Sequence, residues 1–155
     1  MNLKEIQHVL ERCEFFKGLE KGHIEKIARL CQLETYDPGD YVFRQGDFGE
    51  YLYIIIEGHV YLERAVDLDT RKGSVLIGIL GRGRVLGCWS TLLDEPHNLM
   101  SSALCQKPTR LLSIRGSDLR GMMMKDHRFG LNILERLCFL LRDRIQWAYG
   151  AMEKI

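Results

Sequence analysis

The middle of the chain alternates short segments rich in β-branched and aromatic residues with turns that contain glycine, and this alternation limits the fold most strongly. These segments are predicted strands, at residues 41–44, 51–57, 59–64, 75–80, 101–105 and 109–115. Glycine-containing turns separate them at residues 45–49, 57–58 and 67–73. Short strands at this regular spacing predict an antiparallel roll or barrel.

The chain of 155 residues has the length of a single domain, residues 1–155. Its predicted parts are N-terminal helices in residues 1–32, a β-roll over 33–115 and C-terminal helices over 117–150. The N-terminal helices, at 2–13 and 21–32, follow from apolar side chains at helical spacing. We therefore predict an α+β fold: an antiparallel β-roll of the jelly-roll or double-stranded β-helix type, flanked by helices at both ends.

Polar caps are predicted to begin the C-terminal helices. Ser117-Asp118 predicts the N-cap of a short helix to Lys125. Asp126 predicts the cap of a long helix that ends near Gly150.

The long helix carries an apolar seam at alternating three- and four-residue steps, which could pair with a copy of itself. The seam consists of Leu131, Leu134, Cys138, Leu141, Ile145, Ala148 and Met152. A neighbouring stripe consists of Ile133, Leu137 and Leu140. The two adjacent stripes are also compatible with an alternative, a single wide apolar face that packs within a monomer. We predict a homodimer through this helix.

Composition excludes several classes of function. Lys and Arg number 22 against 21 Asp and Glu, and a net charge of +1 gives no general attraction to nucleic acid or to an anionic membrane. The N-terminus lacks the apolar stretch of a signal peptide and no apolar run could span a bilayer, so we expect a cytoplasmic protein. The cysteines form no C-x-x-C pair and the histidines are isolated, so no metal site is predicted.

Three stretches carry a family resemblance: Pro38-Gly39-Asp40, Arg44-Gln45-Gly46-Asp47 and residues 52–60, where glycines at tight turns separate strands. With the order of elements, they resemble the cyclic nucleotide-binding domain of the catabolite-activator superfamily, protein kinase regulatory subunits and cyclic nucleotide-gated channels. The resemblance covers nearly the whole chain and implies a stand-alone sensor domain. The transcription regulators of this superfamily add a helix-turn-helix domain, and the chain stops at Ile155, so we expect no direct DNA binding.

The resemblance also implies a phosphate-binding cassette within residues 81–102. In the family this loop holds a cyclic phosphate with backbone N–H groups and an arginine, while a glutamate accepts from the ribose hydroxyl. Here Cys88 follows Gly87 at the glutamate position, and Leu99 or Met100 stands at the arginine position. Loss of the arginine–phosphate contact costs roughly a hundredfold in affinity. We therefore expect a degenerate cassette.

Residues near the cassette offer substitutes for the missing charged groups. Arg82 and Arg84 flank the glycine-rich loop, and Lys107 and Arg110 lie near the next strands, although any one of them is also interpretable as a solvated surface charge. Trp89 could stack on a planar ligand or fill the pocket itself. The candidate ligand-binding residues are Arg82, Arg84, Gly87, Cys88, Trp89, Ser90, Thr91, Ser101 and Ser102.

These features predict a regulatory sensor and not an enzyme, since no catalytic motif is present. No cofactor is assigned, and a cyclic nucleotide or another small anion is the candidate ligand. The alternative is a ligand-free dimeric scaffold that contacts an effector protein of unknown identity. A haem ligated by His59, His97 or Cys88 is a remoter alternative. The basic residues Arg136, Arg142 and Arg144 alternate with acidic ones and are interpreted as a solvated face.

Overall fold

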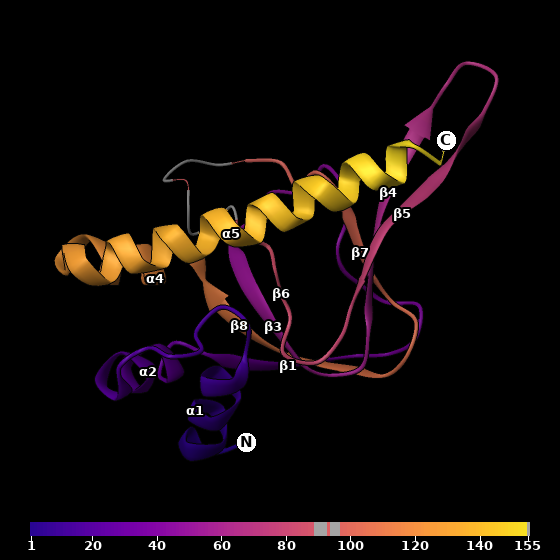
Figure 1. Cartoon of the computed structure of the whole chain (residues 1–155). Coiled ribbons are helices and arrows are strands. Elements are labelled where there is room, and N and C mark those ends of the chain that lie inside the picture. The colour runs from indigo at the N-terminus through magenta and orange to yellow at the C-terminus, as the bar shows by residue number, and fades with distance from the viewer. Residues whose placement is uncertain (89–92, 94–96, 155) are drawn as a thin grey trace.

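The computed structural model describes residues 1–88, 93 and 97–154 of the chain. Within them, two four-stranded antiparallel sheets form a roll (Figure 1). The first sheet has the order β1 (Gln32–Tyr36), β8 (Thr109–Arg115), β3 (Tyr51–Glu57), β6 (Val85–Leu86). The second has the order β2 (Tyr41–Phe43), β7 (Ser102–Cys105), β4 (Val60–Asp67), β5 (Lys72–Leu80). The predicted α+β fold with an antiparallel roll is confirmed.

Helices lie at both ends of the described chain: α1 (Leu3–Arg12), α2 (Lys21–Ala28), α4 (Gly116–Lys125) and α5 (His127–Met152). The side chains of Asn2 and Glu5 each accept from the other's backbone N–H, and this capping box fixes the start of α1. The Asp126 carboxylate accepts from the Phe129 N–H at 3.1 Å, which confirms the predicted cap of α5. The predicted cap at Ser117-Asp118 is wrong, because α4 begins at Gly116 without a side-chain cap.

The core consists of two clusters, one on each face of the first sheet. Side chains alternate along β3, so Leu52 and Ile54 face the helices while Ile55 faces the interior of the roll. All three are fully buried. We name the cluster that contains Leu52 and Ile54 the helix-side cluster, and the cluster that contains Ile55 the roll cluster. Together they fasten the terminal helices to the roll and close its interior.

Several element boundaries differ from the prediction. The second helix ends at Ala28, and residues 32–36, predicted as its end and the start of the roll, form β1. β1 is extended because it pairs with β8, and a partner 81 positions away along the chain gives no local signal. The two-residue strand β6 was not predicted, for the same reason. The β4–β5 hairpin is also longer than predicted, since pairing continues to Asp67 and Lys72.

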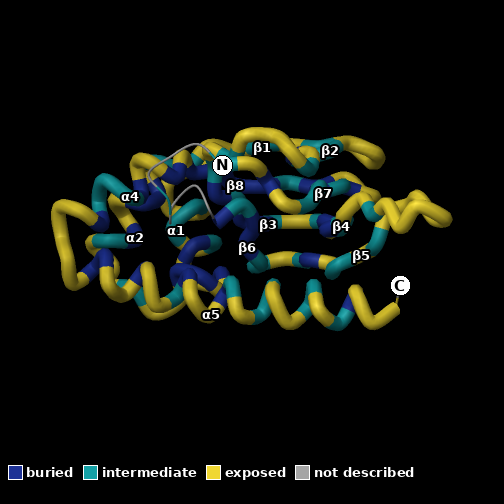
Figure 2. Tube along the Cα trace, turned by 90° about the horizontal axis from the view of Figure 1, so that it is seen from above, coloured by how far each residue is buried: buried dark blue, intermediate teal, exposed yellow. Residues whose placement is uncertain are grey.

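The helix α5 runs along the roll and changes surroundings midway (Figure 2). Its first half buries Phe129, Ile133, Leu137 and Leu140 in the helix-side cluster. Its second half lies beside the edge strand β5, and after Leu140 only Ala151 is buried among its described residues. The first half is therefore anchored more firmly than the second. None of the helices in the described part of the chain has the length and apolar character to cross a membrane.

Candidate functional site

The cassette-like loop begins at Gly87, directly after β6. Gly87 has a φ of +80°, in the left-handed region, and a Cβ there would overlap the carbonyl oxygen of Tyr51. Backbone conformation and space therefore both require glycine. The predicted ligand residues Trp89, Ser90 and Thr91 follow it and lie outside the described residues.

Cys88 stands at the glutamate position of the cassette and is a core residue. Its exposed fraction is 7%, and it packs in the helix-side cluster. Burial raises the pKa of the thiol to about 11, although the nearby Arg144 guanidinium acts in the opposite direction. The thiol is therefore neutral at physiological pH and carries no negative charge for a ligand.

The arginine position of the cassette also holds apolar side chains. Leu99 is 7% exposed and packs in the roll cluster. Met100 is 58% exposed, and its carbonyl oxygen accepts a hydrogen bond from the Arg64 guanidinium. Neither side chain can bind a phosphate by charge.

The predicted polar substitutes lie in different surroundings. Arg82 is exposed and Ser101 is half-buried. The Ser102 Oγ accepts from the Gln45 N–H at 2.8 Å, so this hydroxyl fastens the turn after β2 to β7. Arg84, in the turn before β6, is turned toward α5 and takes part in an ion cluster there.

This ion cluster joins three distant segments of the chain. Arg84 Nε lies 2.7 Å from Glu14 Oε2, and Arg144 Nη2 lies 3.3 Å from Glu14 Oε1. Both guanidinium groups also lie over the Trp147 ring, at 5.1 Å from its centroid for Arg84 and 4.7 Å for Arg144. We name Glu14, Arg84, Arg144 and Trp147 the α5 latch.

The latch also holds the backbone of β6. Glu14 Oε1 accepts from the Val85 N–H at 2.9 Å, and Arg144 Nη2 donates to the Val85 carbonyl oxygen at 2.6 Å. Val85 is three residues from Cys88, so the latch connects the start of the cassette to α5. Movement of either one would strain these contacts.

No sequence pattern indicated Glu14 as a site residue, and the interpretation of Arg144 as a solvated surface charge is wrong. The Arg144 side chain is only 16% exposed, whereas Arg142, paired with Asp143 at 3.1 Å, fits the solvated interpretation. Arg136 differs as well, since it donates to the carbonyl oxygen of Phe15 at 2.9 Å. No local pattern could have indicated these roles, because the partners are 59 to 130 positions apart.

The two apolar stripes of α5 have different surroundings. Ile133, Leu137 and Leu140 are buried in the helix-side cluster. In the predicted seam, Leu131 is 68% exposed, Ile145 is 53% exposed, and Leu134 and Cys138 are also exposed. Leu141 is half-buried against the helix-side cluster. The stripes therefore do not merge into one face packed within the chain, and most of the seam faces solvent.

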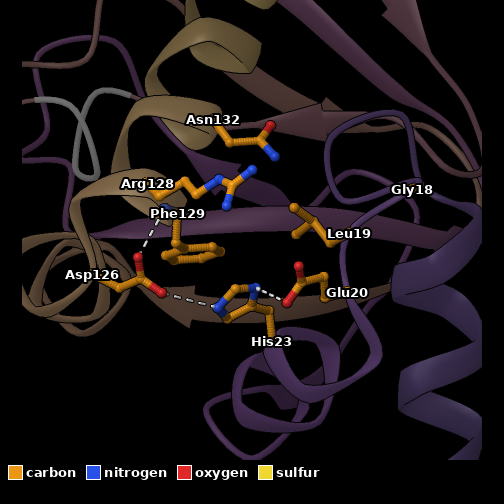
Figure 3. A pocket seen from close by; sticks show the side chains of 8 residues that line it. All are labelled: Gly18, Leu19, Glu20, His23, Asp126, Arg128, Phe129 and Asn132. Atoms are coloured by element: carbon orange, nitrogen blue, oxygen red, sulfur yellow. Dashed lines mark hydrogen bonds and ion pairs between the residues drawn. The ribbon is translucent and has the colours of Figure 1, made fainter.

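A separate surface pocket of 470 Å³ lies where α2 meets the start of α5 (Figure 3). His23 Nε2 lies 3.4 Å from Asp126 Oδ2, and the His23 ring lies against Phe129 with 4.4 Å between ring centroids. The Phe129 N–H bond, with a smaller contribution from His23, keeps the pKa of Asp126 below its usual value. Across the described residues, no group of three His, Cys, Asp or Glu side chains could hold a metal ion.

The two-sheet roll, its flanking helices and the turn at Gly87 after β6 define a class of regulatory domain. A family model described as the cyclic nucleotide-binding domain matches residues 33–126. The chain belongs to the cyclic nucleotide-binding domain family, which is a regulatory fold.

Individual relatives agree with this assignment. The chain is 37% identical over 119 residues to the mouse (Mus musculus) cyclic nucleotide-gated channel alpha-4, covering 77% of the chain and 19% of the channel. Catabolite Activator Protein of Thermus thermophilus has a TM-score of 0.71 and 28% identity, covering 90% of this chain and 62% of that one. The N-terminal domain of a transcriptional regulator from Streptomyces coelicolor A3(2) has a TM-score of 0.69 and 25% identity, covering 87% and 93%. The chain thus spans about a fifth of the channel that it resembles.

Proposed function

We propose that this chain is a non-catalytic sensor module whose cassette has lost the charged groups that bind a cyclic nucleotide in its family. The observation that carries the proposal is that uncharged side chains stand at both charged positions of the family cassette: Cys88 is buried, and at the arginine position Leu99 is buried while Met100 is exposed. A ribose hydroxyl and a cyclic phosphate would each meet an uncharged group there. Burying a charged phosphate without a paired donor is unfavourable.

The proposed output of the module is the position of α5. The α5 latch ties the start of the cassette to this helix through Val85 and Arg144. A ligand changes an equilibrium only if it interacts differently with two arrangements, and the latch is a contact that can differ between them. The exposed seam supports a homodimer through α5, which would pass the change to a second copy and to an effector protein.

Isothermal titration of the purified chain with cAMP and with cGMP tests the cassette. We expect no measurable heat with the wild-type chain at micromolar concentrations. In the double variant Cys88→Glu/Leu99→Arg, the restored charges should improve affinity by roughly a hundredfold. Met124→Arg adds the same cation on the exposed face of α4 and serves as the matched control. Binding by the wild-type chain at micromolar or lower concentrations would contradict the degenerate cassette.

A second candidate function is a ligand-free dimeric scaffold, and the apolar packing of Leu99 inside the roll favours it. The two functions differ in one measurement. A scaffold gives no heat with any nucleotide or small anion, yet keeps the mass of a dimer in light scattering. A sensor changes its hydrogen exchange in α5 when its ligand is added.

A further inference from the structure

The pocket between α2 and the start of α5 is separate from the cassette and from the α5 latch (Figure 3). Its volume of 470 Å³ is large enough for a small metabolite. Its lining combines the half-buried Leu19 and the Phe129 ring, which is 3% exposed, with charged and amide side chains. An apolar lining with a few polar groups is typical of small-molecule sites.

Arg128 and Asn132 form one end of the pocket (Figure 3). They lie four positions apart on α5, a spacing that places both side chains on the same face of a helix. Asn132 Oδ1 accepts from Arg136 Nε at 2.8 Å, so the NH₂ group of the amide remains as a donor. Among the described residues, the Arg128 guanidinium has no hydrogen-bond or ion-pair partner. This end therefore offers donors that match a carboxylate.

Two carboxylates lie around His23 at the other end of the pocket (Figure 3). His23 Nδ1 lies 3.9 Å from Glu20 Oε2, and His23 Nε2 lies 3.4 Å from Asp126 Oδ2. The two acids come from different helix starts, since Glu20 directly precedes α2 and Asp126 directly precedes α5. His23 faces one oxygen of Glu20, and Oε1 is left for another donor. This end therefore suits an ammonium group.

Arg136 connects the two sides of the pocket. Its guanidinium donates to the Lys17 carbonyl oxygen at 2.6 Å and also holds the Asn132 amide. Gly18 follows with a φ of +82°, in the left-handed region, where a residue with a side chain would be strained. The turn before α2 is thus tied to α5 before any ligand arrives, and such preorganisation lowers the cost of binding.

The opposite charges at the two ends limit the ligands that the pocket can accept. A simple anion would be attracted by Arg128 but repelled by Glu20 and Asp126. A simple cation would be attracted by the two acids but repelled by Arg128. A zwitterion places each of its charges beside the opposite charge, so the pocket favours this class.

We propose that this pocket is a binding site for a small amino acid with an apolar side chain. The carboxylate of the ligand pairs with Arg128 and the Asn132 amide, and its ammonium group pairs with Glu20 Oε1. Its side chain packs against Leu19 and Phe129. This inference goes beyond the proposed function, because it gives the chain a second ligand site that does not depend on the cassette.

Calorimetric titration of the full wild-type chain with L-leucine tests the site. We expect one-to-one binding with a Kd of about 0.1 mM, the order of affinity for so small a ligand. L-Leucinamide lacks the carboxylate and 4-methylpentanoate lacks the ammonium group, so each should bind at least about tenfold more weakly. The absence of saturable binding at about 10 mM L-leucine would overturn the proposal. So would an equal affinity for either analogue.

Two variants test which end of the pocket holds which charge of the ligand. Arg128→Gln should lose the preference for L-leucine over L-leucinamide, and Glu20→Gln should lose the preference over 4-methylpentanoate. Arg142→Gln and Glu25→Gln make the same changes at exposed positions of α5 and α2 away from the pocket, and both preferences should remain. Preferences that persist in the two pocket variants would overturn the proposal. If a variant fails to fold, the comparison of the three ligands on the wild-type chain still decides.

Discussion

Glu14 shows how much one side chain can connect. Its carboxylate faces two guanidinium groups and one backbone N–H, from the turn before β6, from α5 and from β6 itself. Burial lowers the pKa of Arg144, and the charge of Glu14 opposes this shift. The carboxylate thus allows two arginines to share a partly buried space.

Replacing Glu14 with alanine should therefore destabilise the fold. The variant leaves Arg84 and Arg144 facing each other and removes the acceptor of the Val85 N–H. Because solvent reaches these side chains and weakens their electrostatic interactions, we expect the free energy of unfolding to fall by only about 1–3 kcal/mol. Urea unfolding measures it. The exposed neighbour Glu11→Ala should stay within about 0.5 kcal/mol of wild type, and equal stability of the two variants would contradict the role of Glu14.

Asp126 predicts a dependence of stability on pH. Its pKa lies below the usual value in the folded chain, mainly because the carboxylate accepts from the Phe129 N–H. Its contribution is therefore fully present above the unfolded pKa, about 4, and is lost as pH falls through the lower folded pKa. Asp126→Asn keeps an N-cap acceptor but does not titrate, so its loss of stability between about pH 5 and 2 should be smaller than that of the wild-type chain.

Thermal unfolding at several pH values compares the two chains. Asp118→Asn, which removes an acid from the first turn of the neighbouring helix α4, is the control. Identical pH profiles of Asp126→Asn and the wild-type chain would show that the Asp126 charge contributes nothing to folding.

At the scale of the elements, α5 has two apolar stripes with different roles. The stripe of Ile133, Leu137 and Leu140 fastens the helix to the domain. The other, with Leu131 and Ile145, leaves large apolar side chains in solvent. Exposed apolar area arranged along one helix is typical of an interface.

Introducing a charge into the seam should separate a dimer. Ile145→Glu places a carboxylate in the middle of the proposed interface, where two copies would meet at equivalent positions. We expect at least a hundredfold weaker association, or about 2.7 kcal/mol. Light scattering over a range of concentrations measures the mass. Gln146→Glu adds the same charge at the next exposed position and should leave the mass unchanged. A wild-type chain that is monomeric at all concentrations would contradict the proposed dimer through the seam.

The same helix shows what the sequence could and could not predict. Periodicity predicted α5 and its two stripes, because these depend on neighbours three or four positions apart, and the preference for aspartate at an N-cap predicted the cap at Asp126. The roll was predicted from strand composition and turn glycines such as Gly46. Contacts between distant segments could not be predicted from the sequence. These are the contacts of Glu14 with Arg144 and of Trp147 with Gly78, and the pairing of β1 with β8. The cassette positions Cys88 and Leu99 or Met100 were recognised, but the burial of Cys88 and Leu99 required the structure.

At the scale of the whole molecule, the proposed association would be linked to folding. The two core clusters join the helices and the roll, so we expect the chain to unfold as one cooperative unit. Only folded chains could form the proposed dimer through α5, so by mass action the folded state would become more stable as the protein concentration rises. A hundredfold increase in concentration should raise the melting temperature of the wild-type chain by about 3–5 °C.

Ile145→Glu should lose this concentration dependence. Its melting temperature at low concentration should stay close to that of the wild-type chain, because the Ile145 side chain is exposed and does not belong to the core. Scanning calorimetry at two concentrations measures both effects in one experiment. A melting temperature of the wild-type chain that does not change with concentration would show that the seam contributes nothing to folding. A drop in the melting temperature of Ile145→Glu at low concentration would instead show that the seam packs within the chain.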